Sequence, residues 1–261
     1  EPLPAGGDVG AYNSYWVDQG ASVVDGARTA LIVEPSNGRL PDLAPGVEMV
    51  TLSLGADLPG ERPIRVRAAG IGADHWEDRG LAERCIVGFS TGPPMLPGGY
   101  NNNIQVFQTE GYVVLLAEMV HDVRVVPLDK RPHLPLAIRQ WLGDSRGYWE
   151  GETLVVETTN FTEKVASFSP MTFDSDLGGF RSLALGTGVS LRLVERFTRI
   201  DTDTLEYEFT IDDPETFSQP LTARFPMNRS DLPLYEYACH EGNYGLLNIL
   251  RGARAEEGNL K

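Results

Sequence analysis

The chain has 261 residues, of which 41% are hydrophobic, so it can bury a substantial core and is not a disordered chain. Its formal net charge of −15 argues against nucleic acid as a partner, because duplex binding draws most of its affinity from Lys and Arg on phosphates. No apolar run approaches the roughly 18 residues that a membrane-spanning helix needs, so we expect no membrane insertion.

Residues 1–27 are rich in glycine and small polar residues, and we predict an N-terminal arm that lies on the body of the protein. The chain starts at Glu1 with neither the charged region nor the apolar core of a signal peptide. Either a targeting segment has been removed or the chain was trimmed. We expect a removed signal peptide, and with it a periplasmic or secreted protein.

Strand-like sequence dominates the rest of the chain. The first predicted strand covers residues 28–34, and residues 41–99 are an irregular insertion with one helix-compatible stretch over residues 74–84. Seven further runs are rich in Val, Ile and aromatic residues, with turn residues between them: 104–108, 112–119, 123–128, 153–158, 190–200, 204–211 and 221–225. The short links favour antiparallel neighbours.

These elements predict a single, mainly β domain over residues 1–261. Its body, residues 28–228, is expected to be an antiparallel barrel of about eight strands, of the calycin or lipocalin kind. Residues 136–142 have helical periodicity, and an apolar stripe over residues 246–253 predicts a C-terminal helix packed on the barrel, within a final segment 229–261. A two-sheet sandwich is the alternative architecture.

Known cofactor and nucleophile signatures are absent from the sequence. There is no nucleotide-binding loop, no zinc-protease motif and no nucleophile elbow. None of the four histidines has metal-site spacing, so we predict neither a metal nor a cofactor: His75, His121, His133 and His240.

The first polar segment covers residues 100–105 and supplies four candidate ligand-binding residues, Tyr100, Asn101, Asn103 and Gln105. Asn103 and Gln105 share one face of the predicted strand, so both amides can point into one cavity. Neutral amides there can orient a ligand or stabilise a developing oxyanion. The alternative is a turn whose Asn side chains satisfy backbone groups.

The second polar segment contains two candidate catalytic residues, Glu118 and His121. If the strand face that begins at Tyr112 is the barrel interior, Glu118 on that face is a buried carboxylate. His121 beside Asp122 is then an oriented base. The alternative is a surface hairpin tip with solvated charges.

Between glycines further along the chain lie three more candidate ligand-binding residues, Asp144, Arg146 and Trp149. A structural ion pair between Asp144 and Arg146 explains this segment equally well.

The third segment, residues 235–245, is the densest in functional side chains. In an extended chain Glu236 and His240 lie on one face. We expect His240 to act as general base, supported by Glu241 or Glu236, with Tyr237 stabilising developing negative charge. Asn243 is a candidate ligand-binding residue. The alternative is that Asn243 caps the last helix while His240 is a satisfied core residue.

The only two cysteines, Cys85 and Cys239, lie far apart and lack Cys-x-x-Cys spacing. Their even number and the processed-looking start favour a disulfide, which suits an exported protein. Two reduced, buried cysteines are the alternative.

Several of these segments resemble a large uncharacterised family of exported bacterial proteins that is abundant in acidobacteria and sphingomonads. The motifs that carry the resemblance are residues 28–35, 100–103, 139–147 with 149–151, and 235–244, and the similarity covers most of the chain. Family members typically begin with a signal peptide and a Pro-Asp-Leu-x-Gly-Val-Trp segment, which this chain lacks. The resemblance implies export, and thereby supports the disulfide, but it assigns no catalytic residue.

The residues together predict a cofactor-independent acid–base enzyme of the lyase, isomerase or cyclase type. Its expected partner is an apolar or aromatic small molecule bound in the barrel cavity. A non-catalytic exported carrier with the same cavity is the first alternative. A glycan-active module is the second, and paired carboxylates roughly 5–9 Å apart would distinguish it.

Overall fold

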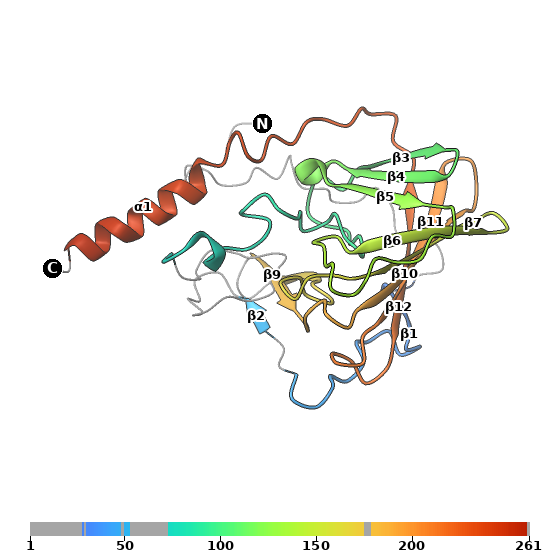
Figure 1. Ribbon diagram of the computed structural model, residues 1–261, viewed down its shortest axis with the longest axis horizontal. Helices are drawn as coiled ribbons and strands as arrows, with labels where there is room; N and C mark the ends of the chain where they lie inside the picture. The colour runs from blue at the N-terminus through green and yellow to red at the C-terminus, as the bar shows by residue number, and fades with distance from the viewer. Residues whose placement is uncertain (1–27, 29, 48–49, 53–72, 175–178, 260–261) are drawn as a thin grey trace.

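The computed structural model describes residues 28, 30–47, 50–52, 73–174 and 179–259 (Figure 1). The predicted N-terminal arm, residues 1–27, lies outside the described residues, as does much of the predicted insertion at 41–99. None of the described helices is both long and apolar enough to cross a membrane.

The described strands form three sheets, in which every pairing between strands is antiparallel. The largest sheet has the order β1 (Ile32–Glu34), β12 (Leu221–Asn228), β11 (Thr204–Asp212), β10 (Arg192–Arg199), β7 (Thr153–Thr159), β6 (Asp144–Glu150). The second has the order β2 (Val50–Leu52), β9 (Gly179–Ala184), β8 (Met171–Asp174). The third has the order β3 (Ile104–Thr109), β4 (Tyr112–Ala117), β5 (Val123–Pro127).

The predicted mainly β class and C-terminal helix are confirmed, but the described strands do not close into a barrel. Strands β1 and β6 end the largest sheet, and β5 lies beside β6 without joining its ladder (Figure 1). The two strands approach closely at Gly147, where a Cβ would lie 2.7 Å from Val126 and 2.8 Å from Leu128. The six-stranded sheet and the sheet of β3, β4 and β5 therefore pack around a common core as an open, curved arrangement.

The core is filled by side chains that alternate along the strands. In β11 the residues Tyr207, Phe209 and Ile211 are fully buried, as their alternation with polar residues predicts. In β4 the buried face is that of Val113 and Leu115, so the face that begins at Tyr112 points outward. The condition under which we expected Glu118 to line an interior cavity is therefore not met.

Two local predictions were wrong. Residues 136–142 form turns and irregular chain although their apolar spacing is helical, because hydrogen bonds to neighbouring segments hold this loop. Within the predicted helix at residues 74–84 only the short 3-10 turn η2 (Trp76–Asp78) forms, followed by further turns.

The C-terminal helix α1 (Tyr244–Asn259) directly follows Asn243, whose side chain accepts a hydrogen bond from the Leu246 amide at 3.3 Å. Asn243 thus caps the helix, as the structural alternative proposed. The helix extends away from the three sheets, so it does not pack on them as predicted (Figure 1). The helix contacts the body through Arg254, which donates to the carbonyl oxygens of Ala73 and Asp74.

The turn that leads into β6 depends on a glycine. Gly143 has φ +69°, and a Cβ there would lie 2.6 Å from the Thr158 methyl group and 2.7 Å from the Thr159 carbonyl oxygen. We expect Gly143→Ala to lower the free energy of unfolding by about 2–3 kcal/mol, since left-handed strain and overpacking add. Urea unfolding measures this, with Gly151→Ala as control, because Gly151 has φ +61° and open space around it. Equal costs for the two variants would contradict the crowding at Gly143.

Candidate functional site

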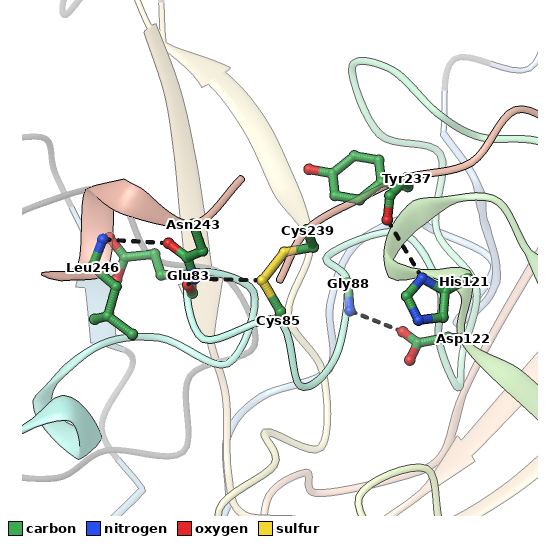
Figure 2. The surroundings of a disulfide bond; sticks show 9 residues. All are labelled: Glu83, Cys85, Gly88, His121, Asp122, Tyr237, Cys239, Asn243 and Leu246. Carbon is green, nitrogen blue, oxygen red and sulfur yellow. Dashed lines mark hydrogen bonds between the residues drawn. A yellow bond between two sulfur atoms is a disulfide. The ribbon is translucent and has the colours of Figure 1, made fainter. Parts of the chain in front are cut away.

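Cys85 and Cys239 form a disulfide, so the predicted pairing is confirmed. The bond joins residues 154 positions apart and ties the segment before α1 to the turn at residues 80–86 (Figure 2). A small apolar cluster surrounds it, made of Met119, Val120, Phe89, Tyr100 and Tyr237. We call these residues, with the two cysteines, the disulfide cluster.

The backbone is strained where the 3-10 turn η3 (Met119–His121) contributes to the disulfide cluster. This turn places Val120 at φ 59° and His121 at φ 47°, and a β-branched residue rarely adopts such angles. His121 Nδ1 lies 3.4 Å from the Tyr237 carbonyl oxygen (Figure 2). Asp122 beside it accepts hydrogen bonds from the Gly88 amide at 3.0 Å and from the Thr91 hydroxyl group. Its carboxylate therefore holds the chain and does not orient His121.

Glu118 is buried, although for a different reason from the one expected. It lies past the end of β4, where its carboxylate accepts a hydrogen bond from Asn103 Nδ2 at 2.7 Å and one from the Tyr235 amide at 3.4 Å. The structure thus brings Asn103, Glu118, His121 and Tyr237 to one end of the three-stranded sheet.

A surface groove of about 470 Å³ lies next to the disulfide, and it includes three candidate residues of the third segment, Glu236, Tyr237 and Asn243. His240 and Glu241 are exposed and are not part of its lining. Within the described part of the chain, neither side chain has a hydrogen-bond partner. The structure therefore gives the His240 imidazole no orienting group.

Four other candidate residues lie apart from this groove. Gln105 is exposed on β3 and Trp149 is exposed on β6. Asn101 has φ 51°, in the left-handed region typical of a turn, while Tyr100 packs edge-on against Phe89 with ring centroids 5.1 Å apart.

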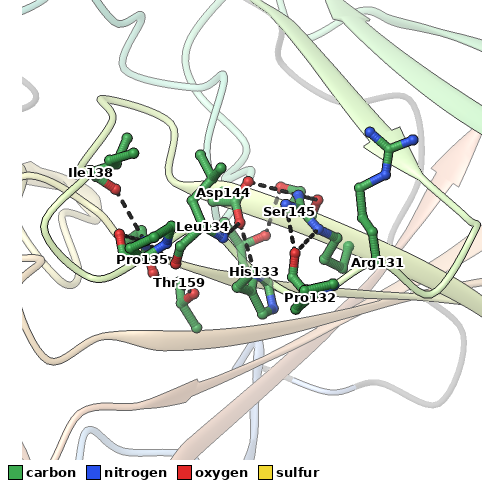
Figure 3. Close-up of polar contacts among 12 residues, drawn as sticks. Arg131, Pro132, His133, Leu134, Pro135, Ile138, Asp144, Ser145 and Thr159 are labelled. Atoms are coloured by element: carbon green, nitrogen blue, oxygen red, sulfur yellow. Dashed lines mark hydrogen bonds and ion pairs between the residues drawn. The ribbon is translucent and has the colours of Figure 1, made fainter.

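A second polar cluster forms where the loop after β5 meets β6. His133 Nδ1 lies 3.0 Å from Asp144 Oδ2, and the same carboxylate accepts hydrogen bonds from the Leu134 amide at 2.9 Å and from Arg146 Nη1 at 2.6 Å (Figure 3). The Asp144 side chain is buried, whereas that of His133 is partly exposed. We call this arrangement the His133–Asp144 pair.

Asp144 is held in its ionised form. Burial by itself raises the pKa of this carboxyl group, but the hydrogen bonds from the Leu134 amide, His133 and Arg146 outweigh burial and hold the pKa below its ordinary value. The structural ion pair between Asp144 and Arg146, the alternative to a ligand-binding role for this segment, is therefore present. The same Asp144 carboxylate also contacts His133.

The loop that carries His133 is fixed from several sides. Asn160 is buried, and its Nδ2 donates to the carbonyl oxygens of Leu134, Pro135 and Ile138 at 3.0–3.1 Å. Arg146 donates to the Pro132 carbonyl oxygen at 3.1 Å. Such support holds the imidazole in one place, as a functional group requires.

We did not single out His133 from the sequence, because its partner lies 11 positions away and no short motif joins them. Its only signal is its position between two prolines, which stiffen the loop.

In the described ranges, no three His, Cys, Asp or Glu side chains converge on a point that could hold a metal ion. Comparison of the chain with protein-family models, with curated proteins and with solved structures finds no match. Function is therefore inferred from the chemistry of the site.

Proposed function

We propose that this protein is an exported acid–base enzyme, of the lyase, isomerase or cyclase type, that needs no cofactor and uses His133 as its general base. The observation that carries the proposal is the 3.0 Å contact between His133 Nδ1 and the buried, ionised Asp144 carboxylate.

The contact determines which nitrogen of His133 can react. A carboxylate accepts hydrogen bonds, so it selects the tautomer in which Nδ1 carries the proton and leaves the Nε2 lone pair to accept one. When Nε2 takes a proton from a substrate, the negative charge of Asp144 stabilises the imidazolium ion that forms. Return of that proton to another carbon of the substrate completes an isomerisation, whereas its transfer to a leaving group, as the bond to that group breaks, completes an elimination.

His133 is a better candidate than the histidines of the other segments. The His240 imidazole is exposed and has no carboxylate partner among the described residues. The His121 ring contacts only a carbonyl oxygen at 3.4 Å, which supplies no charge. A buried carboxylate partner is typical of a histidine that acts as a general base.

The surroundings of His133 favour an apolar or aromatic small molecule. Its loop also carries Leu136 and Ile138, whose side chains are 71% and 50% exposed and so can cover an apolar substrate. The carrier alternative gains no support, because Tyr207 and Phe209 fill the interior where a ligand cavity was expected. The disulfide and the family resemblance support export to an oxidising compartment.

Proton exchange with solvent tests this proposal even while the substrate is unidentified. The protein is incubated in D2O with fractionated bacterial small molecules, and mass spectrometry follows deuterium incorporation into each compound. We expect at least one apolar or aromatic compound to gain deuterium. His133→Gln should slow that gain about 10²–10⁴-fold, which is the usual contribution of a general base.

The matched control is His240→Gln, which removes an exposed imidazole with no carboxylate partner and should leave the exchange rate unchanged. Circular dichroism checks that both variants fold. The proposal fails if no compound exchanges, or if His133→Gln exchanges as fast as the unaltered protein.

A further inference from the structure

Strand β3 forms one edge of the three-stranded sheet, with β4 and then β5 beside it (Figure 1). No backbone hydrogen bond joins its residues to any described segment except β4. Five of its six residues are exposed. The N–H and C=O groups on the outer edge of β3 therefore have no backbone partner among the described residues.

This edge lacks the features by which proteins normally protect an edge strand. Natural edges carry charged residues or proline, or are short and bulged, because an open edge pairs with other chains. The β3 sequence, Ile-Gln-Val-Phe-Gln-Thr, has six residues with no charge and no proline in a chain of net charge −15. Val106 and Phe107 are each 43% exposed. The strand is therefore suited to pairing.

The outward face of the same sheet is apolar. Phe107, Val114 and Val125 lie directly opposite one another across the three strands, and Val125 is 55% exposed. Leu116 and Val123 form a second row beside them. Exposed apolar surface that continues from strand to strand marks an interaction site.

We propose that the outer edge of β3 pairs antiparallel with β3 of a second copy of this chain, about a two-fold axis at Phe107. In this register Phe107 faces Phe107 of the second copy, and Gln105 faces Thr109. The two apolar faces then lie on the same side of a six-stranded sheet. The row of Phe107, Val114 and Val125 therefore continues into the same row of the second copy. Pairing of one strand with its own copy gives the closed, self-complementary contact typical of homodimers.

Charge does not oppose a second copy at this register. The first charged residue after the strand is Glu110, which would lie opposite Ile104 of the second copy and beside the Asn103 amide. The two Glu110 residues lie at opposite ends of the paired strands, so no like charges face each other. The inference is independent of the proposed enzymatic function.

Cysteine cross-linking tests the register. Both native cysteines are in the disulfide, so an introduced cysteine is the only free thiol in the chain. Phe107→Cys places two cysteines directly opposite, with Cα atoms about 5 Å apart, and mild oxidation should link most of the protein as a dimer. Gln108→Cys is the matched control. Its two cysteines are offset by two residues and about 8 Å apart, too far for a disulfide.

Sedimentation velocity tests the association itself. The unaltered protein should sediment as a dimer, and Phe107→Lys should sediment as a monomer because it sets two lysines face to face. Val125→Lys replaces an exposed apolar residue on the same face, two strands from the edge, and should stay dimeric. Two outcomes overturn the proposal: an unaltered chain that is monomeric at high micromolar concentration, whether or not it binds extended peptides, or equal cross-linking of the two cysteine variants.

Discussion

Replacement of Glu195 by glutamine is expected to lower the free energy of unfolding by about 3–5 kcal/mol, the usual cost of breaking a buried ion pair from one side. Glu195 is fully buried in β10, and its carboxylate accepts two hydrogen bonds from Arg124, at 2.5 and 2.9 Å. The substitution leaves the Arg124 charge in the core without a counter-charge. Urea unfolding measures the loss of free energy, provided that the slope of that free energy against urea concentration is the same for both proteins.

The buried pair belongs to a larger network. Tyr207 donates its hydroxyl hydrogen to Glu195 at 2.6 Å and accepts a hydrogen bond from the Met95 amide at 3.0 Å. Burial and the neighbouring Glu195 carboxylate raise the pKa of Tyr207 well above its ordinary value, so the phenol stays protonated and continues to donate. The network thereby connects β5, β10, β11 and the loop before β3.

Two controls separate burial from charge. Glu150→Gln breaks the exposed pair with Arg196, whose atoms are 2.6 Å apart, and should cost less than about 1 kcal/mol. The double replacement Arg124→Met/Glu195→Leu removes both charges, so it should be far less destabilising than the sum of its single changes. If Glu195→Gln cost no more than Glu150→Gln, the buried pair would not contribute to stability as described.

The second large effect is expected at the disulfide. Removal of both cysteines, as Cys85→Ser/Cys239→Ser, should lower the free energy of unfolding by about 5 kcal/mol, because the bond closes a loop of more than 150 residues in the unfolded chain. Denaturant unfolding of the double variant against the oxidised protein measures this loss. The reduced form of the unaltered protein should behave like the variant.

The same change has a local consequence. After the disulfide is lost, the segment before α1 is held by single hydrogen bonds. These include the Asn243 side chain on the Glu83 carbonyl oxygen at 2.7 Å, the Tyr235 amide on Glu118 at 3.4 Å and the 3.4 Å contact between His121 and Tyr237. Residues 229–243 should then be cut first in limited proteolysis, while β6 and β7 stay protected. Unchanged stability together with unchanged cleavage would contradict this role of the disulfide.

The sequence by itself determined the features that depend on residues close together along the chain. Alternation along residues 204–211 predicts one shared face for Leu205, Tyr207, Phe209 and Ile211, because successive side chains of a strand point to opposite sides. The last three are fully buried, whereas Leu205 near the start of the strand is half-buried. The even cysteine count and the signs of export predicted the disulfide. Asn243 was recognised as a possible helix cap because an Asn just before an apolar stripe fits that position.

Only the tertiary structure decided which groups meet from distant parts of the chain. Strand β6 was missed because its glycines and charged residues suit a loop, and it forms because β7 supplies its hydrogen-bond partners. Strand alternation places Glu195 on the same face as the core residues Leu193 and Phe197, so its burial follows from the sequence. Its partner Arg124 lies 71 positions away, so the ion pair does not follow from the sequence.

The choice of histidine shows the same division. The sequence by itself determined a mainly β, disulfide-linked chain with few histidines, and its dense polar segment pointed to His240. The fold left that ring exposed and brought Asp144 to His133 instead. The physical reason is that a side chain's charge environment depends on which strands are neighbours. Which strands lie next to one another depends on how all the elements bury their apolar faces in one core, and no single segment of the sequence determines that.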